Sequence, residues 1–186
     1  MIRIGVFFVV LNILVGCGST KVTDNHPEKI EVFKKFVDAR YFEFNANSAY
    51  PLQTQAFNSV ANSGILPPGS NSGRIDLIGN PSFIKVFGDS VSVILPYFGE
   101  RRMSGGYGAN TDIKFEGIPE QFNMRYDTVK EKYNLQFDIV QNTETYDINL
   151  DIFKNRQASL NINSNQRSTI QYDGVVQELQ DYKEEN

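Results

Sequence analysis

The sequence predicts a mainly β protein, an antiparallel meander closed as a barrel or folded as a sandwich, with one N-terminal α-helix. Two observations predict the sheet: apolar and polar residues alternate over successive segments, and turn residues separate these segments. A third, a 3.6-residue apolar pattern near the N-terminus, predicts the helix. The 186 residues, 40% of them hydrophobic and 22% charged, are typical of one globular domain.

Residues 1–16 have the features of a targeting segment. Arg3 supplies positive charge, and an apolar run from Ile4 to Val15 follows. This run is shorter than the roughly 20 residues that a membrane-spanning helix needs, and it has the length of a signal-peptide core. Residues 1–16 are therefore expected to be a signal peptide.

The segment ends in Leu14-Val15-Gly16-Cys17, which resembles the lipobox of bacterial lipoproteins. The resemblance implies cleavage before Cys17, a diacylglycerol group on its thiol and an acyl chain such as palmitate on the new amine. An ordinary signal peptide with an unrelated cysteine is the alternative, but the one cysteine of the chain stands where the motif requires it. Two or three acyl chains make a stable membrane anchor.

The expected location is the outer membrane of a bacterial envelope. Gly18 follows the cysteine, where an aspartate would favour retention in the inner membrane, and no acidic run follows that would favour display at the surface. We therefore expect the protein to face the periplasm. Residues 17–26 are interpreted as a polar tether, and the net charge of −4 gives no support to nucleic-acid binding.

The folded domain is expected over 27–176, beginning with a helix from Glu28 to Arg40 whose apolar residues recur at helical spacing. Tyr41 to Phe44 starts the β region. The stretch from Asn45 to Ser72 is expected to be largely loop, with a short helix or strand over Gln53 to Ala61. A loop of this length in a compact domain is unusual and suggests a functional crossover.

The next strands are predicted over Gly73–Ile78, Ser82–Phe87 and Ser90–Leu95, the last two joined by a two-residue turn of type II′ or I′. Pro96 removes a backbone donor, so the strand before it must end there, bulge or lie at an edge. A loop from Gly99 to Asn110 follows, and a strand from Thr111 to Glu116 is expected to return beside Ser90–Leu95. We expect this hairpin to be the centre of the fold.

The remaining strands alternate regularly between apolar and polar residues. Their apolar positions are Phe122, Met124 and Tyr126; Tyr133, Leu135, Phe137 and Ile139; Tyr146, Ile148, Leu150 and Ile152; Ala158, Leu160 and Ile162; and Ile170 and Tyr172. Residues 177–186 form an acidic tail. The oxygen-bearing residues of Asp147–Asp151 are spaced as at the start of an EF-hand loop, but the glycine and glutamate of that motif are missing, and a strand with an outward polar face is favoured.

No catalytic constellation is found. The only histidine, His26, lies in the tether, so base chemistry through imidazole has no support, and no metal site or cofactor is predicted. A hydrolase using two carboxylates is the enzymatic alternative. Its candidate groups are Asp76, Asp89, Asp112, Glu116 and Glu120, and spacing favours no pair among them.

The candidate ligand-facing loop contains Tyr97, Arg101, Arg102 and Tyr107, which could line one mouth of the β structure. The competing interpretation is structural, with Tyr97 filling the core and the arginines solvated or paired. Asp127-Thr128-Val129 and Asp89-Ser90-Val91 match a short acceptor pattern for O-glycosylation in Bacteroidota, so Thr128 and Ser90 are candidate modification sites.

Five segments together resemble the family called domain of unknown function 4251: Phe42–Ala46, Leu95-Pro96-Tyr97-Phe98-Gly99, Tyr107-Gly108, Ile113–Gly117 and Ser164–Gly174. The resemblance covers about Ile30 to Val176. It implies a mostly β domain behind a lipid anchor, as in small envelope lipoproteins of Bacteroidota, and it supplies no activity. The expected function is a non-catalytic module that binds a small ligand, a cell-wall component or an envelope protein; a purely structural envelope component is a further alternative.

Overall fold

The computed structural model describes residues 27–102 and 112–179 as one curled antiparallel sheet with two helices. Helix α2 (Pro27–Asp38) comes first, followed by β1 (Tyr41–Pro51), helix α3 (Gln55–Ala61) and the short strand β2 (Ile75–Asp76). The other strands are β3 (Phe83–Phe87), β4 (Ser90–Leu95), β5 (Ile113–Gly117), β6 (Glu120–Asp127), β7 (Lys132–Gln141), β8 (Glu144–Phe153), β9 (Gln157–Ser164) and β10 (Ile170–Glu178). The predicted mainly β class with one N-terminal helix is confirmed.

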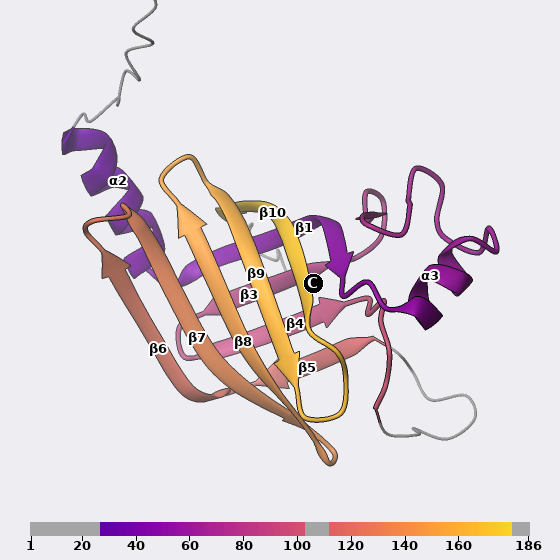
Figure 1. The fold of residues 1–186 in the computed structure, drawn as a ribbon. Coiled ribbons are helices and arrows are strands. Elements are labelled where there is room, and N and C mark those ends of the chain that lie inside the picture. Colours follow the sequence, from indigo (N-terminus) through magenta and orange to yellow (C-terminus); the bar gives the residue numbers. More distant parts are fainter. Residues whose placement is uncertain (1–26, 103–111, 180–186) are drawn as a thin grey trace, which may run out of the picture.

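The strand order is β5-β4-β3-β1-β10-β9-β8-β7-β6, and β2 pairs with β1 beside this path. Two meanders, β3 to β5 and β6 to β10, therefore meet at β1. The sheet curls so that the β6–β10 wing lies across the β1, β3, β4 and β5 wing (Figure 1). Among the described strands the path ends at β5 and β6, so the fold is a half-barrel made from one continuous sheet.

The predicted hairpin is present, since Val91 pairs with Gly117 and Leu95 with Ile113. It lies at one edge of the sheet, whereas β1 and β10 are central, so the expectation that this hairpin is the centre of the fold was wrong. Strand β4 ends at Leu95, directly before Pro96, as a residue without a backbone donor requires.

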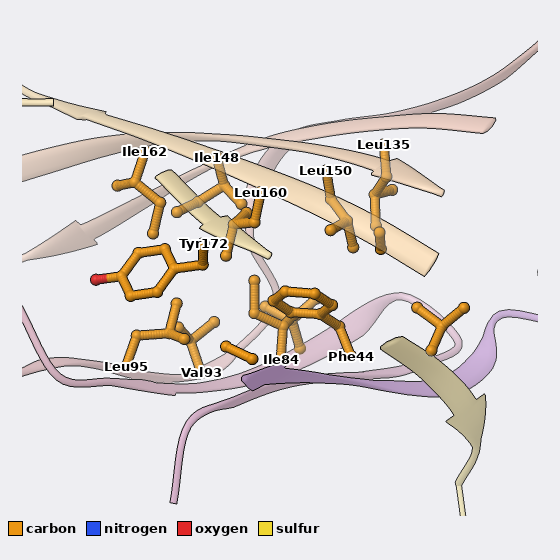
Figure 2. Packing of buried hydrophobic residues seen from close by; sticks show 14 of the residues in the cluster. Phe44, Ile84, Val93, Leu95, Leu135, Ile148, Leu150, Leu160, Ile162 and Tyr172 are labelled. Carbon is orange, nitrogen blue, oxygen red and sulfur yellow. The ribbon is translucent and has the colours of Figure 1, made fainter. Parts of the chain in front are cut away.

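Both wings fill the space between them with apolar side chains. Leu135, Ile148, Leu150, Leu160 and Ile162 of one wing face Phe44, Ile84, Val93 and Leu95 of the other, with Tyr172 between them (Figure 2). All of these side chains are at most 2% exposed. This interior is a packed core, and its alternation with outward polar residues is what the sequence pattern predicts.

Strand β1 is longer than the sequence indicates. It runs to Pro51 and includes Asn45 and Asn47, which were expected to begin a loop. The pairing of β1 with β10 shifts between Ala46 and Ser48, a β-bulge that leaves Asn47 without a partner on β10. The polar residues that suggested a loop are the outward positions and the bulge of a strand.

Helix α2 lies at one end of the half-barrel and α3 at the other (Figure 1). The Phe33 ring of α2 packs edge-on against Tyr133 with ring centroids 5.6 Å apart, and the Tyr133 hydroxyl donates to Asp38 Oδ1 at 2.7 Å. At the start of α3, Thr54 Oγ1 accepts from the backbone N–H of Phe57 at 3.1 Å, a helix cap. No helix in the described part of the chain is both long enough and apolar enough to cross a membrane.

Candidate functional site

The Leu95-Pro96-Tyr97-Phe98-Gly99 segment folds back onto the connection between β9 and β10. The Tyr97 hydroxyl lies 2.8 Å from Ser168 Oγ and donates to the carbonyl oxygens of Ser168 at 2.9 Å and Glu100 at 3.1 Å. A backbone bond from Ser168 N–H to the Glu100 carbonyl, 3.0 Å long, runs alongside. Gly99 is required here, because a Cβ atom would lie 2.5 Å from the Tyr97 hydroxyl oxygen.

A buried ion pair between Arg167 and Glu144 lies next to the contact between Tyr97 and Ser168. Arg167 Nε donates to Glu144 Oε1 at 2.8 Å, and the two side chains are 2% and 7% exposed. Ser164 Oγ donates to the same oxygen at 2.6 Å, and the Arg101 guanidinium lies 3.5 Å from Glu144 Oε2. Burial opposes ionisation of Glu144, but the hydrogen bonds from Arg167 and Ser164 outweigh it and lower its pKa.

These contacts place the predicted ligand-facing residues. Tyr97 is 7% exposed and belongs to the core, Arg101 pairs with Glu144, and Arg102 is exposed. Tyr107 lies outside the described residues, so the loop as a ligand surface stays a prediction. The interior beside Tyr97 is filled by core side chains, and the Arg167 guanidinium lies 4.9 Å from the Tyr97 ring centroid.

A small apolar hollow of about 310 Å³ lies beside the same segment, between α3 and Phe98. Phe57, Ile65, Leu66 and Phe98 give it its apolar character. Its volume is near the lower limit of about 300 Å³ for small-molecule pockets.

A larger groove of about 510 Å³ crosses the outer face of the sheet over β1, β10 and β9. Its walls come from strands that are far apart in the sequence and adjacent in the sheet. The lining residues are Asn47, Ser48, Arg74, Phe153, Gln157, Ala158, Ser159, Gln171, Asp173, Gly174 and Val175. The volume is in the range of about 300–1,000 Å³ that ligand sites occupy.

Hydrogen bonds hold the polar side chains of the groove in place. Asp173 Oδ1 accepts from Ser159 Oγ at 2.9 Å and from Gln171 Nε2 at 3.0 Å, and Gln171 Nε2 also donates to Ser159 Oγ at 3.2 Å. On the other wall, Arg74 Nε donates to Ser48 Oγ at 2.9 Å. These side chains are therefore ordered before any ligand binds, which lowers the entropic cost of binding.

The β-bulge of β1 lies in the wall of this groove, since Asn47 and Ser48 line it. Opposite the bulge stands Gly174, where a Cβ atom would clash with the carbonyl oxygen of Asn45, so only glycine lets β1 and β10 approach this closely. Strand β2 pairs with β1 at Ser48 and brings Arg74, which directly precedes it, to the rim. The sequence does not reveal this site, because most of its residues are ordinary outward positions on separate strands, and only the sheet order brings them together.

Three of the candidate carboxylates make separate local contacts. Asp76 Oδ1 accepts from the backbone N–H of Ile78, Asp89 pairs with Arg40 at 2.9 Å, and Asp112 pairs with Lys114 at 3.2 Å. No group of three or more His, Cys, Asp or Glu side chains with metal-binding geometry occurs among residues 27–102 and 112–179. The carboxylate hydrolase stays a hypothesis.

A row of acidic side chains crosses β6, β7 and β8 instead. In the strand register, Glu120 of β6 stands opposite Asp138 of β7, and Asp138 stands opposite Asp147 of β8. The three carboxylates are therefore neighbours on the outer face. Burial, with the charges of Asp147 and Glu120, raises the pKa of Asp138. Asp147 also lies on the polar face of β8, so the strand interpretation of Asp147–Asp151 is confirmed over the EF-hand alternative.

The remaining candidate sites concern modification. Asp127 Oδ1 accepts from the backbone N–H groups of Val129 and Lys130, so Thr128 lies in an exposed turn between β6 and β7. Ser90 begins β4 and is half-buried. Cys17 lies outside the described residues, and glycosylation and lipidation stay predictions.

The fold and the site define a class of protein: a curled antiparallel half-barrel with a filled interior and a polar groove on its outer face. The chain belongs to the family described as domain of unknown function (DUF4251), whose model matches residues 25–176. This family was inferred from the sequence and is confirmed.

The chain is also similar in structure to a DUF4251 family protein from Bacteroides eggerthii, solved by crystallography. The two have a TM-score of 0.53 and 15% sequence identity, with 81% of this chain and 88% of that chain covered. At this identity the likeness concerns the fold alone. The search of curated proteins gave no match.

Proposed function

We propose that the chain is a lipid-anchored, non-catalytic binding module of the bacterial cell envelope, and that the groove over β1, β9 and β10 is its binding site. The observation that carries this proposal is the ordered polar network in a groove of about 510 Å³ on the outer face. Because the interior is packed with apolar side chains, a ligand has to bind outside the half-barrel.

The anchor is proposed from the sequence. Cys17 follows Leu14-Val15-Gly16, and residues 18–26 separate it from α2. A diacylglycerol group with a further acyl chain would hold the domain at a membrane, because each buried methylene contributes about 0.8 kcal/mol. Gly18 favours the outer membrane, and the domain would face the periplasm.

The anchor is tested by replacing its acceptor atom. In the native host, Cys17→Ser is expected to move the protein from the membrane fraction to the soluble fraction, and the wild type is expected to carry acyl mass. Ser19→Ala is the matched control and should stay with the membrane. A Cys17→Ser variant that remains in membranes, with a wild type that lacks acyl mass, contradicts the anchor.

The binding site is tested with a variant in which a long side chain fills the groove. The full chain, its Asp173→Lys variant and the control Asp147→Lys are purified from native envelopes in lauryldimethylamine oxide, and bound molecules are identified by mass spectrometry. Asp147 is an outward residue of β8 that does not line the groove. We expect the wild type and the control to carry a molecule that Asp173→Lys has lost. Identical sets of bound molecules on all three contradict the proposal.

A further inference from the structure

We infer that the ligand of the groove is an oligosaccharide; this inference rests on the proposed function and names the substrate class of the same site. The first argument is shape. A second hollow of about 370 Å³ adjoins the groove and shares Phe153 and Gln157 with it. Together they form one continuous surface with Phe153 at the junction, so a ligand made of linked units can contact both hollows.

Phe153 is the second argument. It is the last residue of β8, lies on the outer face and is 38% exposed. The ammonium of Lys132 lies 5.8 Å from its ring centroid. An exposed ring between polar walls offers a flat apolar face with negative π density, which suits the electropositive C–H face of a pyranose.

The polar walls supply the third argument. Gln171 and Asp173 offer amide and carboxylate groups, and the Arg74 guanidinium has donors beyond the one bound to Ser48. Planar groups of this kind bind two acceptors or donors at once, and neighbouring sugar hydroxyls present such pairs.

Charge and backbone pairing argue against other ligand classes. The two hollows are lined by three cations, Arg74, Lys130 and Lys154, and by two carboxylates, Asp173 and Glu131, so a polyanion meets nearly balanced charge. Strands β1, β10 and β9 are each hydrogen-bonded on both sides, so a peptide has no strand edge to join. The polar lining offers little to a lipid tail. A neutral, hydroxyl-rich chain fits all of these features.

The experiment is calorimetric titration of the full chain in lauryldimethylamine oxide, a detergent without a sugar headgroup. The probes are maltotetraose, mannotetraose and the β-1,4-linked tetramer of N-acetylglucosamine. We expect saturable binding of at least one probe, weakened at least about tenfold by Phe153→Ala and by Asp173→Asn. The matched control is Phe83→Ala, because Phe83 also lies on the outer face with a lysine ammonium 4.7 Å from its ring but does not line the groove.

Two results overturn the inference. One is the absence of saturable binding of all three tetrasaccharides to the wild type. The other is binding that Phe153→Ala, with an unchanged melting temperature, leaves intact. If the native-envelope experiment then finds a molecule of another class that Asp173→Lys loses, the groove stays a binding site and only its assignment to saccharides falls. If that experiment finds no difference either, the proposed function falls with it.

Discussion

The Glu144→Ala variant tests whether the buried ion pair holds the Leu95–Gly99 segment against the β9–β10 connection. In the wild type, Glu144 Oε1 lies 2.8 Å from Arg167 Nε, and the two side chains are 7% and 2% exposed. Removing the carboxylate leaves a guanidinium charge that solvent cannot reach. Breaking a buried pair in this way costs about 3–5 kcal/mol.

Urea denaturation of the purified chain measures this loss. Thermal unfolding gives a second readout, since for a domain of this size the expected fall in melting temperature is about 6–20 °C, from about 2–4 °C per kcal/mol. The control is Glu31→Ala, which removes a pair with Lys35 whose side chains are 70% and 77% exposed. That pair contributes about 0.5 kcal/mol or less. A double variant, Glu144→Leu with Arg167→Met, removes both charges and is expected to recover most of the lost stability.

The pH dependence gives an independent check. The pKa of Glu144 is lowered in the folded state, so its contribution to stability is present above the unfolded-state pKa and is lost as the pH falls through the folded-state value. The wild type should therefore lose stability in acid more steeply than Glu144→Ala. If Glu144→Ala costs no more than Glu31→Ala at pH 7, the ion pair does not hold this end of the fold.

Two further predictions follow from backbone packing and cross-strand charge. Gly174→Ala is expected to destabilise the fold by about 3 kcal/mol or more in urea titrations, because its Cβ atom would clash with the Asn45 carbonyl. Gly79→Ala, where a Cβ meets no atom within 4 Å, should cost only about 1 kcal/mol for its positive φ; equal losses would refute the close approach. Asp138→Asn is expected to stabilise the protein by about 0.2–1 kcal/mol at pH 7, because it removes repulsion from Asp147. The raised pKa of Asp138 means that this gain should vanish at low pH, and a thermal melt showing no gain at pH 7 contradicts it.

The sequence predicted the C-terminal meander well, because its strands alternate strictly and each has a clear turn after it. Leu135 and Phe137 of β7 are buried as expected, and the polar residues between them face outward. Strand β1 was cut short because Asn45 and Asn47 resemble loop residues. Asn45 belongs to the strand because it pairs with Val175 of β10, more than a hundred residues later, and Asn47 is the bulge within that pairing. Local propensity carries no trace of this distant partner.

The candidate site was less predictable than the fold. The sequence draws attention to Tyr97 and Arg101 as residues that could face a ligand. In the structure Tyr97 instead contacts Ser168, and Arg101 contacts Glu144. A glycine- and arginine-bearing segment looks the same whether its arginine meets a ligand or a buried carboxylate. Only the position of Glu144 distinguishes the two cases. The fold brings Glu144 near Arg101, and nothing in the sequence around Arg101 indicates this contact.

The same geometry explains why a binding site would lie on the outside of this half-barrel. Phe44 and Tyr172 help to fill the interior, so no internal cavity comparable with that of a ligand-holding barrel is available around them. A bulge interrupts the regular outer face of a sheet, because it bends the strand and increases its local twist. The bulge at Asn47 lies at the groove, and the ordered pair of Asp173 and Gln171 stands beside it. The break in the regularity of the sheet therefore lies at the groove that we propose as the binding site.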